Sequence, residues 1–193
     1  MKKLSVLALA IFCLTISVSA IPLQGFLGIS FGASKDEAKV IMSERGYKTP
    51  EASGNTLAWE NSPFAGRNGL IILGFFKDQF FMGLVRIKAD SGKALELYYS
   101  ITSDMAFRYG KADIEREEYK SPYTKGDGHE ETALFSNAAT IYRKWNFDNG
   151  DYIIVNLEYD KKEGSAIVEV SYTNKASMDK YSAAQRSSNI NDL

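Results

Sequence analysis

Three consecutive β-strands near the C-terminus constrain the fold more than any other feature of this sequence. Apolar residues alternate along Thr140–Phe147, Tyr152–Tyr159 and Ala166–Thr173, which is the period of a strand with one buried face. Asn149-Gly150 separates the first two strands and favours a two-residue hairpin, because both central residues of a type I′ turn need positive φ. The pattern predicts an antiparallel meander with one core face and one partly wet face.

The first twenty residues have the pattern of a secretory signal peptide. Lys2 and Lys3 precede an apolar run from Leu4 to Leu14, and the segment closes on Val18-Ser19-Ala20. Cleavage after Ala20 would release a chain that begins at Ile21 and acts in the periplasm or outside the cell. No later apolar run reaches the about 18 residues that a membrane-spanning helix needs, so we expect no transmembrane segment.

Composition narrows the chemistry of the chain that remains. Without residues 1–20 it has 21 Lys and Arg residues against 24 Asp and Glu residues, a formal charge of −3. No basic stripe is present, so we expect no nucleic-acid binding. The one cysteine, Cys13, lies in the predicted signal peptide, which leaves no disulfide, thiolate nucleophile or cysteine metal site in the remaining 173 residues.

Two segments have the periodicity and end signals of amphipathic helices. In Lys35–Arg45, Ser34 and Glu37 fit a capping box at the start, and Gly46 fits the left-handed residue after the end. A second helix begins at Asp90 or Ser91 and ends before Gly110. Its buried stripe is expected to consist of Ala94, Leu97, Tyr98, Ile101 and Met105.

The remaining strands are predicted from shorter patterns. We expect loops at Thr49–Asn55 and Asn61–Asn68, and a hairpin around Lys77-Asp78. The expected strands are Thr56–Glu60, Leu70–Phe76, Gln79–Ala89, Ile114–Tyr119 and Glu131–Phe135.

These elements predict an α+β fold in which two amphipathic helices pack on a mostly antiparallel sheet. We expect a single domain over residues 21–173, followed by a polar C-terminal tail at 174–193 in which a short helix is allowed. The order of a capped helix followed by strands occurs twice, over residues 26–89 and 90–173. A tandem duplication would explain this order, and so would the frequency of helix-plus-meander arrangements in α+β proteins.

The chain resembles a bacterial envelope superfamily in one short motif. Gly28-Ile29-Ser30-Phe31-Gly32-Ala33-Ser34-Lys35-Asp36-Glu37-Ala38, followed by Gly46-Tyr47, is similar to the start of the β-lactamase inhibitor proteins and the SmpA/OmlA outer-membrane assembly lipoproteins. Tyr109-Gly110-Lys111 resembles the same helix ending. The resemblance implies a helix-on-antiparallel-sheet fold and a role in binding other proteins. Inhibitor members carry disulfides and the assembly lipoproteins begin with a lipidated cysteine, and this chain has neither after residue 20.

No motif predicts catalytic residues, a metal site or a cofactor. His129 is the only histidine, and Asp127-Gly128-His129-Glu130-Glu131 matches no metal-binding spacing, so we interpret it as a solvated turn. Strand carboxylates keep one enzymatic alternative open, a cell-envelope hydrolase in which two carboxyl groups serve as acid and base. The candidates are Glu115, Glu117, Glu118, Glu158 and Glu169.

The hairpin around Lys77-Asp78 holds more aromatic residues than a sheet with one buried face requires. Phe75, Phe76, Phe80 and Phe81 would form a partner-binding patch if one face of the hairpin were uncovered, or core if both faces were covered. We therefore expect a non-enzymatic periplasmic or secreted module that binds a protein or an envelope component. A small-ligand carrier is a further alternative, which an enclosed apolar cavity beneath the sheet would favour.

Overall fold

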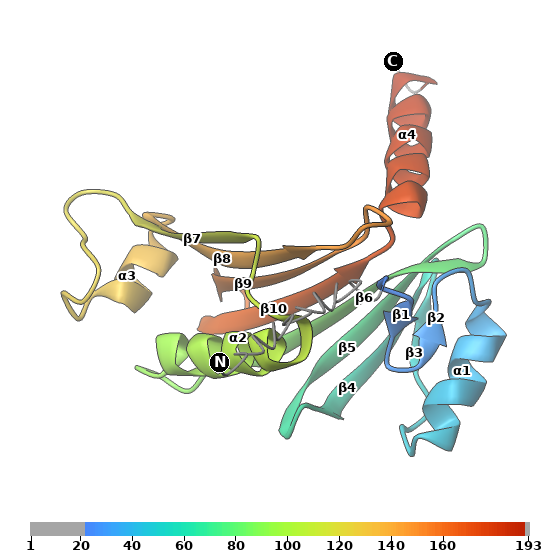
Figure 1. Cartoon of the computed structure of the whole chain (residues 1–193), viewed down its shortest axis with the longest axis horizontal. Helices are drawn as coiled ribbons and strands as arrows, with labels where there is room; N and C mark the ends of the chain where they lie inside the picture. Colours follow the sequence, from blue (N-terminus) through green and yellow to red (C-terminus); the bar gives the residue numbers. More distant parts are fainter. Residues whose placement is uncertain (1–21, 192–193) are drawn as a thin grey trace, which may run out of the picture.

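The computed structural model describes residues 22–191 and has an α+β fold, as predicted (Figure 1). The predicted signal peptide lies outside these residues. Eight strands form one antiparallel sheet, in the order β3-β4-β5-β6-β10-β9-β8-β7. They are β3 (Glu51–Ser53), β4 (Thr56–Phe64), β5 (Arg67–Phe76), β6 (Gln79–Lys88), β7 (Ile114–Tyr119), β8 (Ala139–Asn146), β9 (Tyr152–Asp160) and β10 (Ser165–Thr173).

Helices and a small hairpin accompany this sheet. The helices are α1 (Lys35–Glu44), α2 (Ala94–Tyr109), α3 (Glu130–Phe135) and α4 (Lys175–Asn191), and the hairpin pairs β1 (Gly25–Phe26) with β2 (Ile29–Ser30). The predicted capping box at the start of α1 is confirmed. The Ser34 hydroxyl accepts from the Glu37 N–H at 3.2 Å, and the Glu37 carboxylate accepts from the Ser34 N–H at 2.8 Å.

The sheet divides into two halves that meet at its centre. β6 and β10 pair there in antiparallel register, with Val85 opposite Val170. α1 precedes β3 to β6, and α2 precedes β7 to β10, with α3 inserted between β7 and β8. The order of a helix and four strands is therefore repeated, while a duplication as its origin stays a prediction.

One face of the sheet packs on the helices and forms the core. Alternate residues of the strands lie there, and α1, α2 and α3 contribute buried side chains that include Met42, Tyr98 and Leu134. Trp59 and Trp145 also lie on this face, and their indole N–H groups donate to the carbonyls of Lys48 and Gly110 at 2.7 and 2.8 Å. α4 stands on the opposite side, at one end of the sheet (Figure 1).

The prediction of a strand at Glu131–Phe135 is wrong, because this segment belongs to the helix α3. Ala133 and Leu134 are adjacent and both buried, which a strand with one buried face does not allow. The Glu131 carboxylate also accepts from the backbone N–H of Ala94 at the start of α2, at 3.2 Å. The short helix therefore packs on β8 and β9, and this hydrogen bond joins it to the start of α2.

The predicted loop at Thr49–Asn55 contains a short strand, and the one at Asn61–Asn68 is largely strand. β3 occupies part of the first, and the β4–β5 hairpin extends through the second to a turn at Ala65-Gly66. Pro63 suggested a loop, yet it lies beyond the end of β3, where β4 is the edge of the sheet. A proline is tolerated there because the missing N–H removes no ladder bond.

The turn at Asn149-Gly150 differs from the predicted type I′ turn. Gly150 has a φ of 82°, while Asn149 is not among the residues with positive φ. The Gly150 N–H donates to the Phe147 carbonyl at 2.8 Å, which fits a type I turn followed by a left-handed glycine. Lys77 and Asp78, with φ of 51° and 61°, provide the two positive φ values in the β5–β6 hairpin instead.

The segment predicted as a polar tail forms the long helix α4. Asn174 caps it by accepting from the Ser177 N–H at 3.0 Å. Asp151 is only 2% exposed and accepts from the Lys175 N–H at 2.9 Å and from the Asn174 side chain at 3.1 Å. The buried carboxylate thus joins the start of α4 to the β8–β9 hairpin.

Candidate binding surfaces

The four phenylalanines of the β5–β6 hairpin do not form one exposed patch. Phe75 and Phe80 are 1% and 0% exposed, and their rings pack in the core with centroids 5.8 Å apart. Phe81 is also buried, while Phe76 is half-buried; both contact the ring of Tyr181 in α4. The core on one side and α4 on the other therefore cover this hairpin, which leaves only Phe76 partly accessible to a partner.

Of the five strand carboxylates, two face the helices. Glu115 lies 3.4 Å from the Arg143 guanidinium. Glu117 accepts hydrogen bonds from Tyr99 at 2.9 Å and Lys125 at 2.7 Å. Each of these carboxylates already has a structural partner, and neither lies on the same face of the sheet as the other three.

The other three lie on the opposite face. Glu118 pairs with Arg116 at 2.6 Å near the edge of the sheet. Glu158 and Glu169 both approach Arg86 near the centre, at 3.4 and 3.5 Å. Of the five candidates, the structure brings only Glu158 and Glu169 together.

The segment around His129 is a turn held by its own carboxylates. Asp127 accepts from the backbone N–H groups of Thr124 and His129 at 2.7 and 2.8 Å, and these bonds lower its pKa. Glu130 accepts from the Gly126 N–H at 2.9 Å. Residues 127–129 are exposed, as the interpretation of this segment as a solvated turn predicts.

A surface that sequence reasoning did not single out lies on the sheet face away from α1, α2 and α3. The strand register places Ile72, Leu84, Ser171 and Ile154 opposite one another in a row across β5, β6, β10 and β9. The apolar members of this row are half-buried, and none of them belongs to the core. We call this surface the open sheet face and define it by Leu70, Ile72, Met82, Leu84, Arg86, Tyr142, Ile154, Asn156, Glu158, Asp160, Glu169 and Ser171.

A charged cluster lies at the centre of the open sheet face. The Arg86 guanidinium is 2.7 Å from Asp160 and also pairs with Glu158 and Glu169, so three carboxylates surround one cation. Backbone N–H donors of Glu163 and Lys162, together with Arg86, lower the pKa of Asp160. Burial, reinforced by the charge of Glu158, raises the pKa of Glu169. The cluster therefore carries excess negative charge, part of it on a desolvated carboxylate.

We expect Glu169→Gln to change how stability depends on pH. Because the folded-state pKa of Glu169 is raised, its ionisation opposes folding above that pKa, and the opposition disappears as the pH falls below the ordinary value. The wild-type chain should therefore gain stability relative to Glu169→Gln between neutral pH and about pH 4. Urea unfolding across this range measures the difference.

Asp160→Asn is the matched control for this experiment. The pKa of Asp160 is lowered, so its stabilising contribution is present at neutral pH and is lost as the pH falls through the lowered value. The wild-type advantage over Asp160→Asn should stay constant down to about pH 4 and shrink only when the titration is extended below it, opposite to the trend for Glu169→Gln. The same trend in both variants would contradict the assignment of charges in the cluster.

The sequence contained one signal for this surface. Arg86 interrupts an otherwise apolar strand between Leu84 and Lys88, and Glu169 does the same between Val168 and Val170. Charged residues at alternate positions of central strands indicate a face without a covering helix. The strands were predicted, but their pairing, which brings Arg86 opposite Glu169, was not.

No family model, no curated protein and no solved structure matches this chain. Across residues 22–191, no helix combines the length and the apolar character needed to cross a bilayer.

Proposed function

We propose that this chain is a non-enzymatic periplasmic or secreted module that binds a protein partner through the open sheet face. The supporting observation is the row across β5, β6, β10 and β9, in which Ile72, Leu84 and Ile154 are half-buried apolar side chains beside the polar Ser171. This row lies on the side of the sheet away from α1, α2 and α3. Accessible apolar side chains next to polar and charged groups are a common feature of sites where proteins dock. The predicted signal peptide supports a location outside the cytoplasm.

The charged cluster around Arg86 favours a partner with a basic side chain. The strand register also places Lys88 and Lys144 on this side of the sheet, so the excess of negative charge is local to the cluster. Glu158, Asp160 and Glu169 outnumber Arg86, and Glu169 is desolvated in the free protein. A lysine or arginine from the partner would neutralise this excess while apolar groups cover Leu84 and its neighbours. The partner chemistry is therefore a protein surface with a basic residue among apolar ones.

The cell-envelope hydrolase is supported by one observation. The pKa of Glu169 is raised and that of Asp160 is lowered, a separation that acid and base catalysts share. However, Arg86 pairs with both groups, and the other candidates Glu115 and Glu117 lie on the far face of the sheet. If the wild-type protein hydrolysed a cell-wall glycan and Glu169→Gln abolished this activity, the hydrolase would be favoured over the binding module.

The experiment measures how well a partner protein is captured by two variants, each of which replaces one aliphatic side chain with glutamine. The chain, as its host processes it, is immobilised and exposed to the envelope and secreted fractions of that host. Leu84→Gln changes the open sheet face, and Val40→Gln changes α1, where Val40 is 57% exposed. A partner bound through the open sheet face should lose about fivefold or more in affinity with Leu84→Gln and keep its affinity with Val40→Gln.

The salt dependence of binding provides a second test of the proposed surface. Binding that depends on the excess carboxylates should weaken as the ionic strength is raised from about 0.05 to 0.5 M. A partner captured equally by Leu84→Gln and the wild-type chain would refute the proposed surface. If the wild-type protein formed a stable dimer and Leu84→Gln did not, the open sheet face would bind a second copy of this protein and not a different protein.

A further inference from the structure

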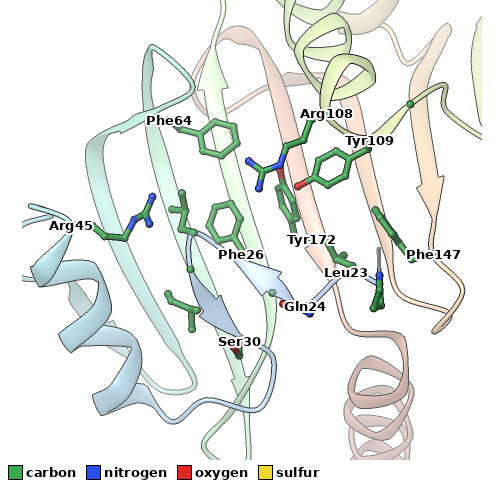
Figure 2. Close-up of a pocket in the computed structure, with 16 residues that line it drawn as sticks. Leu23, Gln24, Phe26, Ser30, Arg45, Phe64, Arg108, Tyr109, Phe147 and Tyr172 are labelled. Carbon is green, nitrogen blue, oxygen red and sulfur yellow. The ribbon is translucent and has the colours of Figure 1, made fainter. Parts of the chain in front are cut away.

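A pocket of about 950 Å³ lies on the helix-covered side of the sheet, between the C-terminal ends of α1 and α2 (Figure 2). Phe26 of the β1–β2 hairpin lies at its centre, with Phe64 and Tyr172 close by (Figure 2). Its volume is within the range of small-molecule sites, which are mostly apolar and contain a few convergent polar groups. The open sheet face lies on the other side of the sheet, so the two sites are separate.

The apolar floor of the pocket is built by close packing. The Phe26 ring lies 4.8 Å from the Tyr172 ring and 5.9 Å from the Phe64 ring, measured between centroids. It also rests on the backbone of β6, where a Cβ on Gly83 would come within 2.5 Å of the ring. The glycine at position 83 is thus required for Phe26 to occupy this place, and the aromatic floor is preorganised.

Two arginines border the pocket from equivalent places in the two halves. Arg45 directly follows α1, and Arg108 lies in the last turn of α2. Figure 2 shows both guanidinium groups directed toward the space around Phe26. Nη1 of Arg45 lies against Gly28, 3.3 Å from where a Cβ would stand, and Arg108 lies over the Tyr109 ring at 5.3 Å.

The pocket is positively charged. No Asp or Glu lines it, and within residues 22–191 neither Arg45 nor Arg108 lies within 4.0 Å of a carboxylate. In contrast, at least one carboxylate pairs with each of Arg67, Arg86, Arg116 and Arg143. A cation at a helix C-terminus is favourable in any protein, but that role does not explain an apolar pocket between two of them.

We propose that this pocket binds an anionic amphiphile. Its carboxylate or phosphate head would lie between Arg45 and Arg108, because a guanidinium donates paired hydrogen bonds to these groups. Its apolar body would cover Phe26, Phe64 and Phe147, all of which line the pocket. An amphiphile free in solution and the headgroup region of an anionic lipid share this chemistry.

Isothermal titration calorimetry tests the proposal with probes that have alkyl chains of equal length. The protein is used in the form into which its host processes it. The probes are decanoate, decyl phosphate and decyltrimethylammonium, each below its micelle-forming concentration. The anionic probes should bind saturably, one per chain, and the cationic probe should not. Vesicles of phosphatidylcholine with and without phosphatidic acid form the second arm; binding only to the acidic vesicles would identify the lipid as the source.

Variants locate the binding site. Arg45→Gln combined with Arg108→Gln should weaken anion binding at least tenfold, because two charge-assisted contacts are lost. Both side chains are exposed, so folding should be unaffected, which circular dichroism checks. Arg186→Gln, at an exposed position in α4, should bind like the wild-type chain. Unchanged affinity in the double variant, equal binding of the cationic probe, or no binding to any anionic probe or vesicle would overturn the proposal.

Discussion

Replacing Phe80 with alanine is expected to lower the free energy of unfolding by about 3–5 kcal/mol. The ring is fully buried and packs between Phe75 and Phe31, with centroid distances of 5.8 and 5.5 Å. Its removal leaves a cavity in the core that the paired strands β5 and β6 cannot easily fill. Urea unfolding followed by far-ultraviolet circular dichroism measures the loss.

Phe76→Ala is the control on the same hairpin. Phe76 is half-buried, and its ring centroid lies 5.8 Å from that of Tyr181 in α4. Its replacement should therefore lower the free energy of unfolding clearly less than that of Phe80. Equal small losses for both variants would contradict the assignment of Phe80 to the core. This pair of variants also separates folding from binding, because a partner lost in Phe80→Ala alone would report unfolding and not a binding surface.

Replacing Asp151 with alanine is expected to cost about 2–3 kcal/mol of stability. The carboxylate is 2% exposed and accepts from the side chains of Asn149 and Asn174 and from the N–H of Lys175, at 2.9, 3.1 and 2.9 Å. Alanine leaves these donors without their acceptor and frees the start of α4 from the β8–β9 hairpin. Chemical denaturation gives the overall loss, and amide hydrogen exchange shows where protection falls.

Asp151→Asn distinguishes the hydrogen bonds from the space that the side chain fills. Asparagine has nearly the same size but only one acceptor oxygen, so it should retain part of the stability that alanine loses. Exchange should accelerate first in the amides of α4 and less in those of the central strands β6 and β10. Uniform acceleration throughout the sheet, or no loss in Asp151→Ala, would show that this carboxylate does not hold α4.

The strands were the most predictable part of this fold because alternation of apolar residues reports directly on one buried face. The three strands of the C-terminal meander were found to within a residue or two, and the capping box at Ser34 fixed the start of α1. Glu131–Phe135 was misassigned as a strand because the six residues of α3 are too few to separate a helical period from an alternating one. The length of α4 was missed because Asp151, which holds its first turn, is distant in sequence.

The candidate surfaces were less predictable because they depend on strand pairing. Phe75 and Phe80 were correctly noticed as excess apolar residues, but their burial depends on the core and on Phe31, and that of Phe81 depends on α4. The open sheet face requires β6 to pair with β10, which brings Arg86 opposite Glu169 although the two residues are far apart in sequence. The pocket requires the ends of two helices to converge on Phe26, which no local pattern encodes.

The most direct test of the proposed function is site-specific photo-crosslinking in the producing cell. A photoreactive residue is placed at Leu84 or Ile154 on the open sheet face, and at Val40 on α1 as the reference position. The proposal predicts that one protein crosslinks from positions 84 and 154 and not from position 40. Crosslinking of the same protein from position 40, or none from either position on the open sheet face, would contradict it.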